Sequence, residues 1–317
     1  MRAPAYHLRP NKAVDRLIFM DAIRWIGRLH PLNQYTYYGL GGPYLEDFRM
    51  LYEMHPEDAV VSIERDREVY KRQQFHLPCA TLQVKRAELS SFISRFDPDD
   101  HAAIFWLDYT NLRYSNFEEF SALLQRLAFD SLVKITLRAE WKDFMNRVPG
   151  DDKPAEFRKM FAALMPDPSA NPPINTEAFA ALVQSMLRTA VQRALPAATG
   201  KAFQPICTFY YSDGTFMFTS TGVVCARDEK DAAREMFQNW KFASLHWAKP
   251  KRIDVPTLTT KERLLLQEFL PCESRAGRML RGKLGYLIDD TRAKTDAKLR
   301  QYAQFHRYYP YVMRAVP

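Results

Sequence analysis

The sequence predicts an α/β fold built on a doubly wound, mostly parallel sheet. Short apolar runs of strand length alternate with helical patterns five times over roughly the first 140 residues. Two of the runs, 59–63 and 102–107, are apolar almost throughout, as in strands buried on both faces. An Asp-Gly pair at Asp213 and Gly214 predicts that the sheet closes with an antiparallel hairpin.

The first half of the chain supplies the alternating elements in order. Residues 11–30 place apolar side chains at helical spacing, and Asn11 is the expected N-cap of this helix. The expected strands are 34–38, 59–63, 81–84, 102–107 and 132–137. Helical patterns at 44–53, 67–75, 89–96 and 117–129 separate them.

The second half departs from this alternation. Residues 142–204 combine proline-rich loops with helical patterns, which predicts a helical insertion. Two β-rich runs then flank Ser212, Asp213 and Gly214. Methyltransferase sheets close with such a hairpin, whereas dinucleotide dehydrogenases do not usually end in this way. We expect residues 1–249 to form the main domain and 250–317 a small basic C-terminal module.

Composition limits the class of protein. A chain of 317 residues with 47% hydrophobic residues can bury a substantial core, and its net charge of +8 fits an anionic partner or an ordinary basic enzyme. The four cysteines have no C-x-x-C spacing, which argues against a zinc site, and we expect no metal. Without a signal sequence or an apolar run near ~20 residues, we expect a cytoplasmic protein that does not enter a membrane.

A glycine-rich turn follows the first expected strand. Gly39, Gly41 and Gly42 allow a sharp turn and leave room for a ligand to approach main-chain N–H groups. The full G-x-G-x-x-G motif of dinucleotide folds is missing, which favours S-adenosylmethionine, a cofactor without a pyrophosphate. Glu64 ends the second strand at the spacing expected for a ribose-binding acid. Asp66 is the alternative, and either carboxylate can instead cap the next helix.

Asp108 ends the fourth expected strand, at the edge of a parallel sheet where ligands bind. We expect Asp108, with Tyr109 beside it, to orient or deprotonate a methyl acceptor; a turn or a helix cap is the alternative. Arg9, Lys12 and Arg16 form a basic stripe at the N-terminus. This stripe either holds a phosphate or carboxylate of the substrate or is a solvated helix face.

The C-terminal module combines basic and aromatic residues, a combination suited to nucleic acid. The basic residues are Arg275, Arg278, Arg281, Lys283, Arg292, Lys294, Lys298 and Arg300. The aromatic residues are Tyr302, Phe305, Tyr308, Tyr309 and Tyr311. We favour burial for the rings, and contact with an anionic partner for part of the charge.

Several short motifs together resemble a bacterial family described as O-methyltransferases. They are the segment Leu8-Arg9-Pro10 with Lys12, the segment 37–48 around the glycines, the run 62–64, and the segment 106–109. The likeness resumes at 254–259 and 262–264. The resemblance implies a Rossmann-like, class I methyltransferase fold with the cofactor over Gly39–Gly42 and its ribose on Glu64. It also implies a winged-helix-like C-terminal module and a role in phage defence.

The leading hypothesis is therefore an S-adenosylmethionine-dependent transferase acting on an O or N nucleophile, with nucleic acid as a candidate acceptor. The alternative is a catalytically inactive sensor or partner subunit that binds the cofactor and contacts nucleic acid through 250–317. A protein partner or a homo-oligomer is compatible with either hypothesis.

Overall fold

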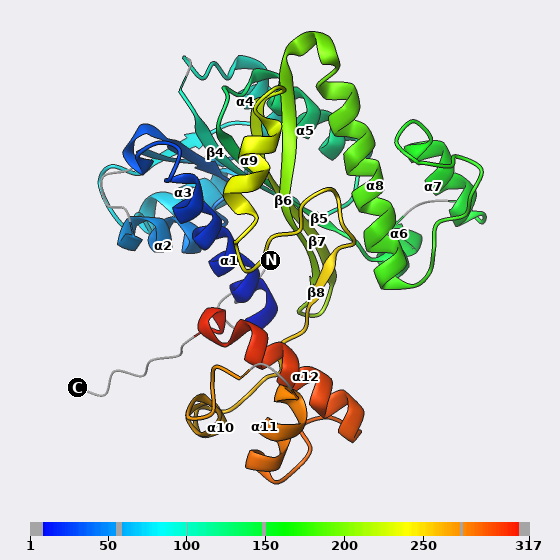
Figure 1. The fold of residues 1–317 in the computed structure, drawn as a ribbon. Coiled ribbons are helices and arrows are strands. Elements are labelled where there is room, and N and C mark those ends of the chain that lie inside the picture. The colour runs from blue at the N-terminus through cyan, green and yellow to red at the C-terminus, as the bar shows by residue number, and fades with distance from the viewer. Residues whose placement is uncertain (1–8, 55–58, 100, 148–149, 273–274, 311–317) are drawn as a thin grey trace. The chain divides into compact units, whose positions relative to one another are not determined.

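Eight strands form one sheet in the order β3-β2-β1-β4-β5-β7-β6-β8 in a computed structural model of the chain (Figure 1). The structure describes residues 9–54, 59–99, 101–147, 150–272 and 275–310. Strands β1 to β5 pair in parallel, and β7 pairs antiparallel with β5. This order, with β1 and β4 at the centre and an antiparallel hairpin at the closing side, is that of a class I methyltransferase sheet. The predicted fold class is confirmed.

The first five strands lie within a few residues of the predicted runs, the two hairpin strands are longer than predicted, with β6 beginning inside the range 142–204 expected for the insertion, and β8 was not predicted. The strands are β1 (Thr36–Gly39), β2 (Ala59–Glu64), β3 (Gln83–Arg86), β4 (Ala103–Asp108), β5 (Ser131–Arg138), β6 (Lys201–Ser212), β7 (Phe216–Ala226) and β8 (Lys251–Ile253). The helices are α1 (Pro10–Ile26), α2 (Glu46–Met54), α3 (Arg67–Phe75), α4 (Leu89–Arg95), α5 (Tyr114–Arg126), α6 (Trp141–Arg147), α7 (Lys153–Phe161), α8 (Thr176–Ala194), α9 (Lys230–Phe237), α10 (Thr260–Gln267), α11 (Ala276–Leu284) and α12 (Arg292–Phe305).

The chain divides into two compact units. The sheet unit comprises residues 19–210 and 215–251, and the terminal unit comprises the described parts of 1–18, 211–214 and 252–317. The domain boundary expected between 249 and 250 stays a prediction. No helix in the described ranges is both long and apolar enough to cross a membrane.

Helices cover both faces of the sheet unit. On one face, α4, α5 and α8 enclose the largest core cluster against strand residues such as Phe105 and Val133. On the other face, Phe19 of α1 contacts the Trp106 ring edge-on at 5.4 Å, and Phe48 of α2 meets Tyr37. Phe105 and Trp106 point to opposite faces because successive side chains alternate across a strand. Both faces of β4 are therefore buried, as its apolar sequence predicts.

The predicted insertion contains one helix that belongs to the sheet layers. α8 packs on α5 and β7 and contributes buried residues to the same core cluster as α4 and α5. α6 and α7 lie outside these layers, and rings from both helices meet α8 in one aromatic cluster. Its members are Trp141, Phe144, Phe157, Phe161 and Phe179.

The N-terminus of α1 corrects one sequence-based expectation. α1 begins at Pro10, so Asn11 lies inside the helix rather than at its cap. The carboxylate of Asp213 accepts hydrogen bonds from the backbone N–H groups of Asn11, at 3.3 Å, and Lys12, at 2.8 Å. The Asn11 side chain donates to Ser212 and Asp213 and accepts from the Val255 N–H at 2.8 Å. A residue about 200 positions away therefore supplies the cap, which local sequence cannot reveal.

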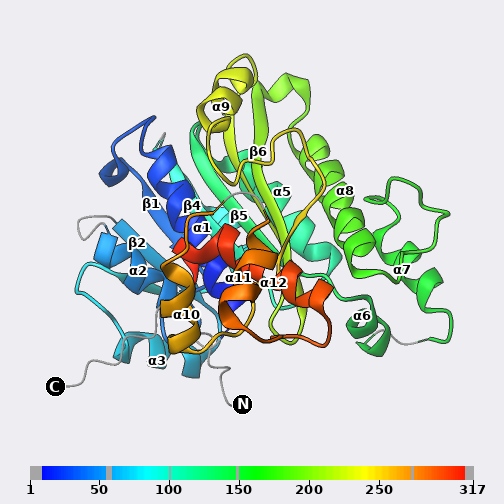
Figure 2. The same cartoon turned by 60° about the horizontal axis from the view of Figure 1, so that its bottom comes forward.

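The terminal unit is helical beyond β8. Figure 2 shows α10, α11 and α12 grouped together, and α11 packs closely on α12. Gly277 permits this packing, since a Cβ there would lie 2.0 Å from the carbonyl oxygen of Asp296. Across the described residues 254–272 and 275–310 no strand occurs, so the structure there shows helices without the strands of a wing. Leu8 and Tyr311 lie outside the described residues.

Candidate cofactor and active site

Gly39, Glu64 and Asp108 lie at the carboxyl ends of three neighbouring parallel strands. Gly39 pairs in register with Ser62 of β2 and Trp106 of β4, so Glu64 and Asp108 each lie two residues further along. The chain reverses its winding direction between β1 and β4. The carboxyl side of such a switch point is where open α/β sheets bind ligands. The structure thus brings the predicted cofactor and acceptor residues to one edge.

The glycine turn between β1 and α2 has no room for a side chain at Gly41. A Cβ there would lie 2.5 Å from Leu45 and 2.6 Å from the ring of Phe48. Gly42 has a φ of +57°, a conformation that glycine adopts without steric cost, and the space around its Cβ position is open. The turn therefore combines a packed side at Gly41 with an open side at Gly42, where a ligand can approach the backbone.

A buried hydrogen-bond chain fixes the turn from below. The side-chain amide of Gln73 donates to the carbonyl oxygen of Gly42 at 2.8 Å, and Ser62 Oγ donates to Gln73 Oε1 at 3.0 Å. Both side chains are fully buried. Tyr37, beneath Gly39, donates to Asp47 at 2.8 Å. Sequence reasoning missed Gln73, because a glutamine in a polar helix gives no sign that it faces the core.

Glu64 and Asp66 have different roles. Asp66 caps α3, since its carboxylate accepts the N–H groups of Glu68 and Val69 at 2.9 Å each. One carboxylate oxygen of Glu64 accepts the Asp66 N–H at 2.8 Å, which orients the group. Burial raises the pKa of Glu64 above its ordinary value, and the N–H bonds of Asp66 and Arg65 oppose this shift. The half-buried carboxylate of Glu64 suits a ligand that donates hydrogen bonds, such as a ribose diol.

Asp108 and Tyr109 are adjacent in sequence but differ in environment. Asp108 is half-buried at the end of β4, in register with Thr136. Tyr109 is buried, and its hydroxyl donates to Glu119 Oε2 at 2.7 Å. Burial first, then the charge of Glu119, raises the pKa of Tyr109 well above the usual range. The position of Tyr109 is that of a residue held in the core, and its catalytic role stays a prediction.

Backbone hydrogen bonds hold the segment after Asp108 against β5. The Tyr109 N–H donates to the Thr136 carbonyl at 2.9 Å, and the Arg138 N–H donates to that of Asn111 at 3.3 Å. The Arg138 side chain forms an ion pair with Asp143 at 2.9 Å. The segment after Asp108 is thereby connected, through β5 and Arg138, to α6, the first helix of the predicted insertion.

The predicted basic stripe of Arg9, Lys12 and Arg16 and the basic residues of the C-terminal module all lie in the terminal unit. Lys12 and Arg16 are both buried, with 8% of each residue exposed, and Arg9 is half-buried, so the stripe is not a solvated helix face. In the C-terminal module, Tyr302, Phe305 and Tyr309 are buried and belong to the packing of the helices.

The charge of the module is partly neutralised within it. Arg281 pairs with Asp296 at 2.6 Å, Lys294 with Asp290 at 2.8 Å, and Lys298 with Asp254 at 2.7 Å. Of the basic residues predicted to form this cluster, Arg275, Arg278, Lys283, Arg292 and Arg300 are exposed and have no ion pair among the described residues; Lys283 lies over the ring of Phe269. Among the same residues, no group of three or more histidine, cysteine or acidic side chains is placed to hold a metal ion.

Comparison with known proteins gives one family match. A family model described as "Putative O-methyltransferase" matches residues 4–316. No curated protein sequence matches the chain.

Solved structures of similar fold are distant in sequence. One is Trm1 from Pyrococcus horikoshii with S-adenosyl-L-methionine, at 11% identity and a TM-score of 0.46, with 70% of this chain and 57% of that chain covered. The fibrillarin/Nop5p complex is 10% identical with a TM-score of 0.36, and the match covers 59% of this chain and 72% of that chain. A LepI complex with SAM is 12% identical with a TM-score of 0.36, and the match covers 63% of this chain and 46% of that chain. Because these TM-scores lie below 0.5, the fold is assigned from the strand order of the chain itself.

Proposed function

We propose that this chain, which belongs to the family described as "Putative O-methyltransferase", transfers a methyl group from S-adenosylmethionine to an oxygen or nitrogen nucleophile. The observation that carries the proposal is the glycine turn and the Glu64 carboxylate at the switch point of the sheet. S-adenosylmethionine supplies a methyl group on a positively charged sulfur. The cytoplasmic location and the role in phage defence stay predictions.

The residues at this edge fit such a cofactor. Gly41 is packed so closely on α2 that no side chain can enter the turn, and Gly42 is open on its outer side. Glu64, oriented by the Asp66 N–H, would accept hydrogen bonds from the ribose hydroxyls. Gln73 would act as a positioning residue, because it fixes the Gly42 carbonyl without itself reaching the surface.

Asp108 is the residue that would act on the acceptor. It ends β4 next to the glycine turn, half-buried, and the backbone after it is tied to β5. A carboxylate there can accept the proton of an attacking hydroxyl or hold an amine in line with the methyl group. Positioning of the nucleophile then supplies much of the rate, since a bound nucleophile in line with the methyl group reacts as if highly concentrated.

Nucleic acid is our proposed class of acceptor. Its support is the net charge of +8 and the exposed arginines of the terminal unit that lack an ion pair among the described residues. Phosphate oxygens are the natural partners of such side chains. The buried rings of Tyr302, Phe305 and Tyr309 are not part of this proposal, because they cannot stack on bases.

The first experiment measures cofactor binding by calorimetric titration of S-adenosylmethionine and S-adenosylhomocysteine. Glu64→Ala should weaken both by about tenfold or more, the loss of a hydrogen-bonded charge. Asp66→Ala is the matched control: it removes a neighbouring carboxylate that caps α3, so folding stability should fall while cofactor affinity stays close to wild type. Wild-type protein that binds neither compound would contradict the proposal.

The second experiment measures transfer of a labelled methyl group to bulk RNA and DNA. Asp108→Asn should abolish transfer while cofactor affinity is retained, because the carboxylate acts on the acceptor. Cofactor binding without transfer to RNA, DNA or protein in any wild-type reaction would contradict the enzyme proposal and favour a cofactor-binding sensor.

A further inference from the structure

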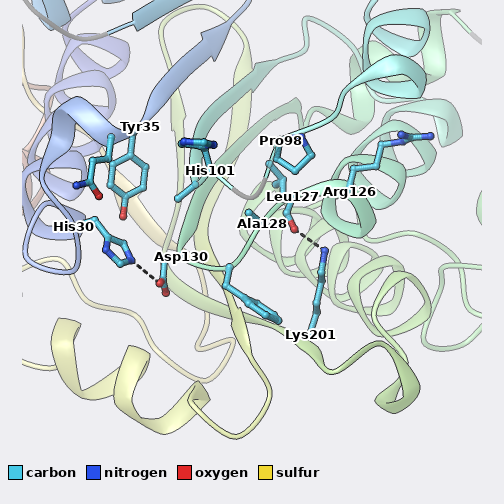
Figure 3. A pocket seen from close by; sticks show the side chains of 12 residues that line it. His30, Tyr35, Pro98, His101, Arg126, Leu127, Ala128, Asp130 and Lys201 are labelled. Atoms are coloured by element: carbon cyan, nitrogen blue, oxygen red, sulfur yellow. Dashed lines mark hydrogen bonds and ion pairs between the residues drawn. The ribbon is translucent and has the colours of Figure 1, made fainter.

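A cavity opens at the edge of the sheet opposite the glycine turn (Figure 3). Its volume is about 510 Å³, within the range of roughly 300–1,000 Å³ for small-molecule pockets. Tyr35 directly precedes β1, Ala102 precedes β4, Asp130 precedes β5, and Lys201 begins β6; all four line the cavity. The cavity and Asp108 lie at opposite ends of β4. At a rise of about 3.3 Å per residue, the length of this strand separates them by roughly 20 Å.

Tyr35 lines this cavity and has a buried hydroxyl. The residue is 2% exposed, and its hydroxyl has no hydrogen-bond partner within the described part of the chain. Tyr37, two residues along and equally buried, donates its hydroxyl to Asp47 at 2.8 Å. Buried polar groups nearly always have a partner, so the exception at Tyr35 needs an explanation. A ligand in the cavity would supply the missing acceptor.

The Tyr35 phenol is neutral, so its hydroxyl can donate a hydrogen bond. Burial first, and then the negative charge of Asp130, raises the pKa of Tyr35, so the phenol keeps its proton at neutral pH. His30 Nε2 lies 2.9 Å from Asp130 Oδ2, so one oxygen of this carboxylate already has a partner. Figure 3 shows the Tyr35 hydroxyl on the same side as the His30–Asp130 pair.

The other end of the cavity carries two fixed cations. Lys201 donates to the carbonyl oxygens of Gln125 and Leu127 at 3.0 and 2.6 Å, and Arg126 donates to that of Phe96 at 3.1 Å. An ammonium has three donor protons and a guanidinium five, so each retains donors for a ligand. Figure 3 shows Tyr35 and Lys201 on opposite sides of the cavity.

An apolar wall completes the cavity. Pro98, Leu127 and Phe129 are among the lining residues, and Phe129 is 45% exposed although it is a large aromatic residue. Such a ring offers a surface for a flat group to stack on. The cavity thus combines a donor at one end, cations at the other and an aromatic side chain.

We propose that this cavity binds a nucleoside monophosphate, at a site separate from the methyl-transfer edge. The base directs a carbonyl oxygen toward the Tyr35 hydroxyl and lies against Phe129, and the phosphate lies toward Lys201 and Arg126. The proposal does not depend on which methyl acceptor the chain uses.

The test is a titration of uridine 5′-monophosphate into the full-length protein by calorimetry, with uridine and inorganic phosphate as separate probes. Tyr35→Phe should weaken the binding of uridine monophosphate and of uridine by about tenfold, as expected for one lost hydrogen bond to a buried group, and should leave the binding of phosphate unchanged. Phe129→Ala should weaken the binding of the same two compounds. Excess S-adenosylhomocysteine should not displace uridine monophosphate.

The matched control is Tyr37→Phe, which removes a buried hydroxyl that already has a partner. It should lower the melting temperature and leave uridine monophosphate affinity unchanged, whereas Tyr35→Phe should not lower the melting temperature of the ligand-free protein. Equal affinity in wild type, Tyr35→Phe and Phe129→Ala would overturn the proposal, as would displacement by S-adenosylhomocysteine or no binding of any probe at millimolar concentration. Binding of S-adenosylhomocysteine in the same samples separates this failure from a failure of the proposed cofactor site.

Discussion

At the scale of single residues, the carboxylate of Glu64 carries the cofactor proposal. Its side chain accepts the backbone N–H of Asp66 and is half-buried, and burial raises its pKa above the ordinary value of 4.5. The ionised form accepts hydrogen bonds from a diol through both oxygens, whereas the protonated form loses part of that capacity. The protonation state of Glu64 should therefore control cofactor affinity.

We expect S-adenosylhomocysteine affinity to fall as the pH is lowered through the pKa of Glu64, beginning above pH 4.5 because that pKa is raised. Affinity falls rather than rises because the ionised form of Glu64 is the one that binds the cofactor. Calorimetric titrations between pH 8 and pH 5 measure the effect, with circular dichroism to verify folding. Glu64→Gln, which cannot ionise, should bind weakly and with little pH dependence. A variant with the same pH profile as wild type would assign the titration to another group.

Gln73 decides the geometry of the glycine turn without contact with a ligand. Gln73→Met keeps the length of the side chain but leaves the Gly42 carbonyl and the Ser62 hydroxyl without this partner, at about 1–3 kcal/mol for each buried group. We expect lower stability to urea and weaker S-adenosylhomocysteine binding. Ser62→Ala removes only the group that orients Gln73 and should cause the smaller loss in both measurements. Unchanged affinity in Gln73→Met would show that the turn does not need this hydrogen bond.

At the scale of elements, α1 depends on a cap from the β6–β7 turn. The carboxylate of Asp213 accepts the first backbone N–H groups of the helix, within the terminal unit. Asp213→Ala should lower the free energy of unfolding by about 1–2 kcal/mol, the usual cost of a missing cap. Asp213→Asn keeps an acceptor oxygen, so its free energy of unfolding should fall by less. Urea denaturation of the three proteins measures the difference, and equal midpoints would show that water replaces the cap.

Aromatic packing joins the three helices of the insertion between β5 and β6 to one another. Rings of α6 and α7 pack on Phe179 of α8 with centroid distances of 5.9 Å for Trp141 and 5.8 Å for Phe157. Such pairs are favourable beyond the area that they bury. The proline-rich stretches on either side of α7 indicate loops, but they give no sign that the rings of α6, α7 and α8 meet.

At the scale of the whole molecule, the net charge of +8 supports an anionic partner. We expect the double change Arg278→Glu with Arg292→Glu to weaken RNA and DNA binding and to reduce the salt dependence of affinity by about one counterion for each phosphate that the variant no longer binds. Both side chains are exposed. The control is Arg67→Glu with Lys71→Glu on α3, which changes the net charge equally. Fluorescence anisotropy at several salt concentrations measures both, and equal losses would indicate a net-charge effect without a defined surface.

The sequence by itself determined the first five strands and the closing hairpin turn of the sheet, because strands buried on both faces are apolar throughout and helices carry a different period, as at 59–63 and 102–107. It also placed Gly39, Glu64 and Asp108 at strand ends, since strand ends follow directly from where apolar runs stop. Tertiary structure alone decided which groups meet: the cap that Asp213 gives to α1, the support of Gly42 by Gln73, and the cavity beside Tyr35. Each of these joins residues that are distant in sequence, and a side chain's partner across such a distance is set by packing, which no local pattern encodes.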